Sequence, residues 1–170
     1  RERVETYIDC LIREMQETAR ICKDKVLDTV YIGGGTPTTL EAEQLDRLIR
    51  NLKEIFDFST VKEFTVEAGR ADSITREKLE VLKKYGVTRI SVNPQTMHDK
   101  TLQLIGRRHT VGQAVDAYHM ARELGFDNIN MDLIAGLPGE HPEEMEDTLR
   151  QIKELAPDSL TVHALAMKHG

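Results

Sequence analysis

The sequence has 170 residues, enough for one domain with a sizeable core. Its 31% charged and 39% hydrophobic residues are typical of a soluble globular protein, and no apolar run approaches the ~20 residues of a membrane span. The formal net charge of −6 argues against a broad surface for nucleic acid or anionic membranes. The two cysteines, Cys10 and Cys22, lack the spacing of a disulfide framework, which favours a reducing cytoplasm.

Both ends of the sequence look cut from a longer chain. Arg1 opens directly into a helical pattern, and the last residues follow closely on a strand-like run. We therefore expect residues 1–170 to be a single domain that is part of a larger protein.

Helical and strand-like patterns alternate along the whole sequence. In chain order they are a helix from Arg1 to about Lys23, a strand at 29–32, a helix at 45–55, a strand at 63–67, a helix at 75–86, a strand at 88–93, a helix at 110–125, a strand at 128–134, a helix from 142 to just before 157, and a strand at 160–165. Such alternation predicts an α/β fold with one parallel sheet and right-handed crossovers.

Several helix starts carry capping signals. Thr38 and Glu41 form a candidate capping box before the second helix, and Thr110 with Gln113 forms another. Pro142 is suited to the first turn of the last helix.

The strands alternate between apolar and polar residues, although strands buried on both faces usually read as continuous apolar runs. Phe64 and Val66 alternate with Thr65 and Glu67, for example, and the three strands that follow show the same pattern. One face of the sheet is therefore apolar and the other polar. We predict an incomplete parallel β/α barrel of about five strands, with outer helices and a polar interior. The alternatives are a one-layer sheet with a wet polar face and a doubly wound sheet, which the alternation disfavours.

The first strand ends in Gly33-Gly34-Gly35-Thr36-Pro37. Three consecutive glycines lack Cβ atoms, so their backbone groups can approach a ligand closely. The dinucleotide fingerprint and the P-loop lysine are both absent.

Further polar residues stand where the predicted strands end, which is where barrels of this type carry their function. They are Glu67, Asn93 with Gln95, and Asp132, while Arg107 lies in the loop before the fourth helix. Carboxylate and amide groups at several strand ends favour a ligand site at one rim of the sheet.

Taken together, these motifs resemble the radical S-adenosylmethionine (SAM) domain of oxygen-independent coproporphyrinogen III oxidases. The resemblance runs from about Asp28 to the end of the sequence. It rests on Gly33-Gly34-Gly35-Thr36-Pro37, Val66-Glu67, Gln95, Gly106-Arg107-Arg108 and the segment Asn130-Met131-Asp132-Leu133-Ile134-Ala135-Gly136-Leu137-Pro138-Gly139. The phrases Glu67-Ala68-Gly69-Arg70 and Asn93-Pro94-Gln95-Thr96-Met97 look most like the branch called coproporphyrinogen dehydrogenase.

The resemblance implies a SAM site built from eight residues: Gly34, Gly35, Thr36, Glu67, Gln95, Arg107, Asp132 and Ala166. The glycine loop would meet the methionine amino group, and Glu67 would lie beside the cofactors. Arg107 would pair with the SAM carboxylate, for which its planar guanidinium is suited. Gln95 and Asp132 would hold the ribose hydroxyls, and Ala166 would offer backbone groups to the adenine.

It further implies that the full-length enzyme uses SAM and a [4Fe–4S] cluster. A 5′-deoxyadenosyl radical would then convert porphyrinogen propionates to vinyl groups in haem biosynthesis, with an external electron donor. The family's cluster loop, C-x₃-C-x₂-C, is absent from this sequence. Cys10 and Cys22 lie more than about 15 Å apart along one predicted helix and cannot replace it. No metal ligand is therefore assigned, and we expect Cys22 to be buried as a small hydrophobic residue.

Two alternatives from the same resemblance remain open: a haem chaperone that carries haem instead of oxidising porphyrinogens, and a radical SAM enzyme acting on another substrate. Among the histidines, His163 alternates inward on the last predicted strand. It either contacts the substrate or pairs with Asp132 or Asn130, and we favour the structural role.

Overall fold

Five parallel strands form one sheet, and they lie side by side in chain order, β1-β2-β3-β4-β5. The computed structural model describes residues 2–22 and 24–166. The strands are β1 (Thr29–Ile32), β2 (Glu63–Ala68), β3 (Arg89–Val92), β4 (Ile129–Ala135) and β5 (Ser159–Ala164). Their bounds differ from the predicted ones by a single residue at most, so the predicted parallel sheet is confirmed.

The helices are α1 (Glu2–Ile21), α2 (Ala42–Ile55), α3 (Arg76–Lys84), α4 (Asp99–Leu104), α5 (Val111–Glu123) and α6 (Pro142–Leu155). All but α4 were predicted; two short 3₁₀ turns, η1 (Pro37–Thr39) and η2 (Ala71–Ser73), were not. The predicted ends of the first helix, Arg1 and Lys23, lie outside the described residues. Within the described residues, no helix combines the length and the apolar character needed to cross a membrane.

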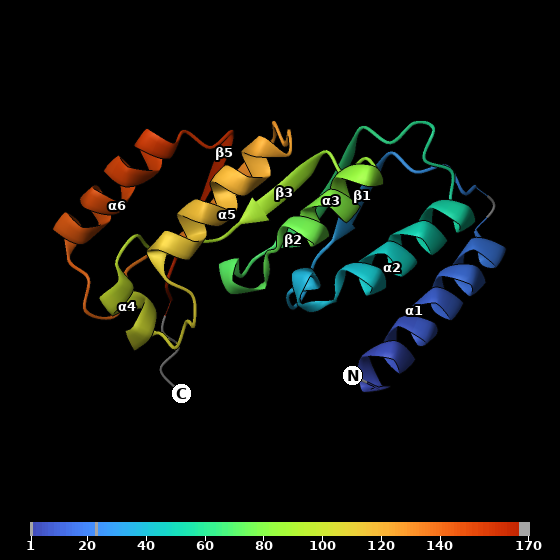
Figure 1. Ribbon diagram of the computed structural model, residues 1–170, viewed down its shortest axis with the longest axis horizontal. Coiled ribbons are helices and arrows are strands. Elements are labelled where there is room, and N and C mark those ends of the chain that lie inside the picture. Colours follow the sequence, from blue (N-terminus) through green and yellow to red (C-terminus); the bar gives the residue numbers. More distant parts are fainter. Residues whose placement is uncertain (1, 23, 167–170) are drawn as a thin grey trace.

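The strand order explains why the helices gather on one side of the sheet. A right-handed crossover between neighbouring parallel strands always places its helix on the same face when the order never reverses. Figure 1 shows α2, α3, α5 and α6 as one layer over the strands. The architecture is an open sheet of the barrel type, with β1 and β5 as its edges, and the doubly wound alternative is excluded.

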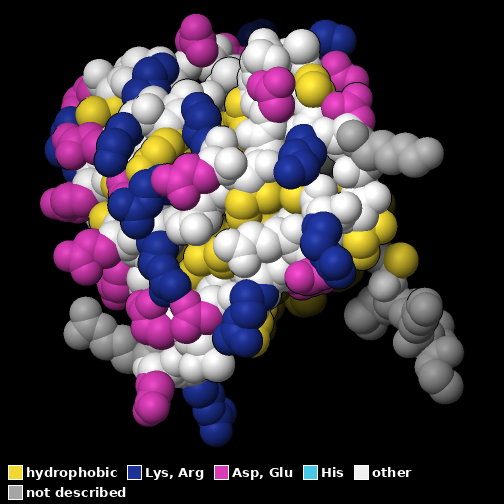
Figure 2. All heavy atoms as spheres, turned by 90° about the vertical axis from the view of Figure 1, so that its right-hand side faces the viewer, with side chains coloured by type: hydrophobic (Ala, Val, Ile, Leu, Met, Phe, Trp, Pro, Cys, Tyr) yellow, Lys and Arg dark blue, Asp and Glu magenta, His cyan; other side chains and the backbone are white. Residues whose placement is uncertain are grey.

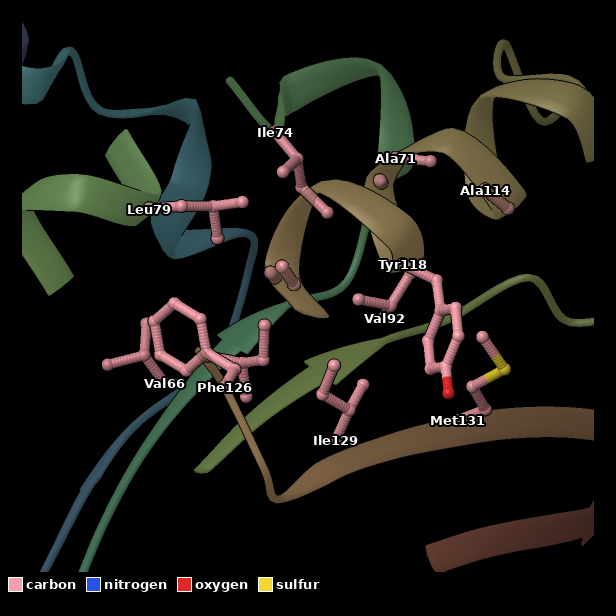
Figure 3. Packing of buried hydrophobic residues seen from close by; sticks show 14 of the residues in the cluster. Val66, Ala71, Ile74, Leu79, Val92, Ala114, Tyr118, Phe126, Ile129 and Met131 are labelled. Carbon is pink, nitrogen blue, oxygen red and sulfur yellow. The ribbon is translucent and has the colours of Figure 1, made fainter. Parts of the chain in front are cut away.

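The apolar face of the sheet forms the core with this helix layer. Phe64 and Val66 of β2, Ile90 of β3, and Ile129 and Met131 of β4 are at most 1% exposed. Figure 3 shows labelled members of this cluster pointing from the sheet toward α5 and the η2 turn. Their alternate neighbours therefore point to the opposite, polar face, as the strand period requires.

The last strand departs from this arrangement. Leu160 and Val162 were expected to meet the helices, but they are 40% and 47% exposed. The reason is that β5 is an edge strand, and no helix follows it in the described part of the chain.

Two of the predicted helix starts are confirmed and one is wrong. Thr110 caps α5, accepting from the Gln113 N–H at 3.2 Å, and Pro142 occupies the first turn of α6. Thr38 caps nothing, because it lies in η1, fully buried, with its hydroxyl 2.6 Å from that of Ser73. Helix α2 instead begins after Glu41, whose N–H donates to the side chain of Gln44.

Helix α1 packs against α2 at the end of the helix layer. Ile8 is fully buried there, and Arg47 of α2 forms ion pairs with Glu5 and Asp9 of α1. Figure 2 views this end of the molecule, where apolar atoms are exposed among charged side chains. A groove runs here between α1 and the glycine loop, lined by Val4, Tyr7, Ile32 and Pro37 among others.

Candidate functional site

The glycine loop leaves the carboxyl end of β1 in an open conformation. Gly34 has a φ of +106°, which favours glycine over other residues. A Cβ added at Gly34 or at Gly35 would find no atom within 4 Å, so the backbone here is accessible. Thr36 follows in an extended conformation and precedes the η1 turn. The loop therefore offers free backbone to a ligand, as predicted.

Glu67 lies one residue before the end of β2, on the polar face. Its carboxylate accepts a hydrogen bond from the hydroxyl of Tyr31, which belongs to the neighbouring strand β1. This bond raises the pKa of Tyr31 to about 12, helped by burial and by the charges of Glu67 and Asp132, while Arg89 opposes it. Tyr31 was not predicted as a site residue.

Gln95 sits in a turn just after β3, with a φ of +70° that is rare outside glycine. Its backbone is anchored to β4 on both sides: its N–H donates to the Asp132 carbonyl at 3.0 Å, and its carbonyl accepts from Ile134 at 2.9 Å. The two predicted ribose contacts, Gln95 and Asp132, are thus brought to adjacent positions. Asn93, two residues earlier, has a buried Oδ1 without a hydrogen-bond partner among the described residues.

Asp132 points to the polar face from β4. Its Oδ1 accepts from Asn130 Nδ2 at 2.6 Å, and its Oδ2 lies 3.8 Å from His163 Nε2 on β5. Asn130 in turn accepts from Ser159 of β5 at 2.9 Å. His163 thus lies near Asp132, one of the two residues with which it was expected to pair, but the 3.8 Å separation is longer than a hydrogen bond.

Arg107 lies between α4 and α5 and is half-buried. Its N–H donates to the Leu102 carbonyl at 2.9 Å, and the ion pairs among the described residues do not include its guanidinium. A cation held by the backbone, with its charged group unpaired, is suited to an anionic ligand.

His109, two residues further on, is only 2% exposed. Its Nε2 lies 3.4 Å from the Pro94 carbonyl, which ties the Arg107 loop to the turn at Gln95, and its Nδ1 has no partner among the described residues. Burial lowers the pKa of His109, and the charges of Arg107 and Arg70 act in the same direction, against the Pro94 bond and Asp72. The imidazole therefore stays neutral.

Beside it, Arg70 and Asp72 form a bidentate pair with contacts of 3.2 and 3.0 Å. Burial raises the pKa of Asp72, but the hydrogen bonds and charge of Arg70 outweigh it, and the pKa lies below its usual range. Arg70 is therefore occupied, in contrast to Arg107.

Ala166, the last described residue, is exposed two positions after β5. Six of the eight predicted residues thus lie in the segments that follow β1, β3, α4 and β5. A seventh, Glu67, is the penultimate residue of β2. Asp132 stands slightly earlier, within β4.

These residues fit SAM. Arg107 provides a cation without an ion pair among the described residues, and Gln95 lies next to Asp132. Gly34 and Gly35 leave open space beside their backbone. The orphaned Oδ1 of Asn93 also indicates that a donor is missing at this edge.

The residues do not fit an iron–sulfur cluster. Cys10 and Cys22 are both free and exposed, so the predicted burial of Cys22 is wrong. It follows the last residue of α1, where the chain has already left the packed face of the helix. Among residues 2–22 and 24–166, no three His, Cys, Asp or Glu side chains are grouped to hold a metal ion.

Comparison with known proteins identifies the family. The family model "Radical SAM superfamily" matches residues 7–152. The chain belongs to the radical SAM superfamily.

Its relatives include both enzymes and chaperones. The oxygen-independent coproporphyrinogen-III oxidase-like protein HemZ of Bacillus subtilis is 47% identical over 99% of this chain and 34% of its own length. The heme chaperone HemW of the same organism is 37% identical over 97% of this chain and 44% of its own length. The structure of coproporphyrinogen III oxidase (HemN) from Escherichia coli superimposes with a TM-score of 0.89 at 32% identity, covering 96% of this chain and 38% of that one. The chain therefore spans between about a third and somewhat less than half of the length of these proteins.

Proposed function

We propose that this chain is the SAM-binding portion of an oxygen-independent coproporphyrinogen III oxidase or dehydrogenase, one domain of a longer protein. The observation that supports the proposal is the hydrogen-bonded pair Gln95 and Asp132 at the carboxyl edge of the sheet. The open backbone of the glycine loop supports it further, as does the guanidinium of Arg107, which has no ion pair among the described residues. Similarity to HemZ and HemN supports the choice of reaction.

Each residue has a task that its chemistry suits. Gly34, Gly35 and Thr36 hold the amino group of SAM through the backbone, and Arg107 holds its carboxylate. Gln95 and Asp132 bind the ribose hydroxyls, and the Ala166 backbone meets the adenine. Glu67 lies beside the cofactor with one oxygen held by Tyr31.

The full-length protein would combine SAM with a [4Fe–4S] cluster to supply the radical that takes a hydrogen atom from a porphyrinogen propionate. The residues of this chain bind and orient SAM, whereas the cluster ligands, the porphyrinogen site and the contact with an electron donor belong to other parts of the protein. The cysteine content favours the cytoplasm as its location.

A haem chaperone of the same family is the second candidate, and the 37% identity to HemW supports it. Both candidates keep a SAM-binding edge, so the substrate must distinguish them. We would incubate the full-length protein anaerobically with SAM, a reductant and coproporphyrinogen III, and follow the mass of the porphyrin product.

We expect the porphyrin to lose two carboxyl groups when SAM is present and none when SAM is omitted. Stoichiometric binding of haem without any decarboxylation would contradict the oxidase proposal and favour the chaperone.

A further inference from the structure

Tyr31 occupies an unusual place on the polar face. It stands on the edge strand β1, is 60% exposed, and its hydroxyl reaches across to Glu67 on β2. The register pairs Tyr31 with Thr65, so Tyr31 must lean along the strand, toward the glycine loop, to reach Glu67. Thr65, on the same face, is completely buried although the sheet is open.

Gly33 makes this reach possible. A Cβ at position 33 would collide with Cε1 of the Tyr31 ring and lie 3.1 Å from Cδ of Glu67. Gly33 is not among the glycines with positive φ, so its backbone would accept alanine. What position 33 requires is space for the Tyr31–Glu67 pair. The first glycine of the loop thus has a different role from Gly34, whose φ of +106° itself favours glycine.

Tyr31 also keeps its proton throughout the physiological range. Its hydroxyl donates to Glu67, and the hydrogen bond, burial and the charges of Glu67 and Asp132 disfavour the phenolate, whereas the charge of Arg89 favours it. It is therefore a permanent hydrogen-bond donor to the carboxylate.

We propose that Tyr31 is a positioning residue of the cofactor site, which holds one oxygen of Glu67 so that the other is directed to the bound ligand. The proposal rests on the SAM-binding function proposed above and adds to it a residue on β1 and a reason for Gly33. A carboxylate on an open sheet face has several accessible rotamers, and a hydrogen bond from a fixed aromatic ring selects one of them before the ligand arrives.

The test measures SAM affinity of the full-length protein by calorimetric titration. Tyr31→Phe keeps the ring and removes the donor, and we expect it to weaken SAM binding roughly three- to tenfold. Tyr85→Phe is the matched control, because Tyr85 also donates to a carboxylate, Asp46, at 2.9 Å but lies on the helix side of the sheet. It should leave SAM affinity unchanged.

A double-mutant cycle then shows whether Tyr31 acts through Glu67. If it does, Tyr31→Phe should have almost no effect in a Glu67→Ala background, which leaves no side-chain oxygen to accept the hydrogen bond. A merely structural role would not produce this loss of effect.

Gly33→Ala tests the same pair from the other side. It should weaken SAM binding in the parent by displacing the ring, and should matter much less in a Tyr31→Ala background. Equal SAM affinity of the parent and Tyr31→Phe, or full additivity with Glu67→Ala, would overturn the inference while leaving the proposed function intact. A parent protein that does not bind SAM would overturn both.

Discussion

At the scale of single residues, the buried histidine of the Arg107 loop couples its protonation to folding. His109 joins two segments that carry proposed ligand contacts, through its bond to the Pro94 carbonyl. Its burial among Arg70, Arg107 and Asp72 makes the neutral form the stable one. Protonation of His109 therefore opposes folding.

The sign of the resulting pH dependence follows from the lowered pKa. The unfolded chain binds a proton at its ordinary pKa of 6.5, and the folded chain only at a lower pH. The stability contributed by neutral His109 is thus complete above about pH 6.5 and is lost as the pH falls through the folded pKa.

We predict that His109→Gln, which cannot titrate, reduces the loss of stability between about pH 7 and about pH 5. Urea unfolding at several pH values measures this loss. His119→Gln, at an exposed histidine outside this loop, is the control for replacing a histidine by glutamine. An identical pH dependence in His109→Gln and the parent would contradict the prediction.

Residues such as Gln95 and Asp132 were predictable because they stand at the ends of recognisable strands. Tyr31 and His109 were not, since nothing local distinguishes them: one is a tyrosine in a β-type run, and the other is a loop histidine. Their roles depend on Glu67 and Pro94, partners that only the folded sheet brings near.

At the scale of elements, strand alternation and caps were predictable, because both are local. Thr110 with Gln113 and Pro142 mark the helix starts of α5 and α6 as their chemistry requires. Thr38 shows the limit of such signals, because a tertiary contact with Ser73 takes its hydroxyl away from any cap. Helix α4 is too short to give a periodic pattern.

The turn that follows the glycine loop is held by a buried lysine. Lys78 of α3 is 8% exposed, and its ammonium donates to the Thr38 carbonyl at 2.8 Å and to the Ser73 carbonyl at 3.1 Å. It thereby ties η1 to η2, and both turns stand at the carboxyl edge of the sheet. Lys78 therefore supports the glycine loop indirectly, through the two turns.

We predict that Lys78→Met destabilises the protein by about 2–3 kcal/mol, because it removes hydrogen bonds from a charged donor and leaves two carbonyls unpaired. Chemical unfolding measures the change. Lys53→Met is the matched control: Lys53 also donates to a carbonyl, that of Tyr85 at 2.9 Å, but is exposed, and its loss should change stability little. An equal loss of unfolding free energy in the two variants would contradict a stabilising role of the buried Lys78 hydrogen bonds.

At the scale of the whole molecule, the open sheet and the site at its carboxyl edge belong together. An uninterrupted strand order leaves the polar face uncovered by helices, so the polar side chains of β2, β3 and β4 face the interior of a barrel-type fold. The sequence predicted this from alternation, whereas the exposure of Leu160 and Val162 on the edge strand depended on which neighbours β5 has.

The cysteine content leads to a further prediction for this chain of 170 residues. With two exposed cysteines and no group of three potential ligands among the described residues, anaerobic reconstitution with iron and sulfide should leave the chain without a stable cluster. Absorbance and iron content after desalting measure the outcome. A stoichiometric brown species that disappears in Cys10→Ser or Cys22→Ser would contradict this assignment.

The most direct test of the SAM site is the affinity of the full-length protein for SAM when Arg107 or Asp132 is replaced by alanine. Each substitution removes a charge-assisted contact and should weaken binding by roughly 1.5–3 kcal/mol, tenfold or more, with little change in stability. Two control variants should bind SAM as the parent does. Arg108→Ala replaces the exposed neighbour of Arg107, and Asp127→Ala replaces an exposed carboxylate at the opposite end of β4 from the site. If Arg107→Ala and Asp132→Ala bound SAM as tightly as the parent, the site would not lie at this edge of the sheet.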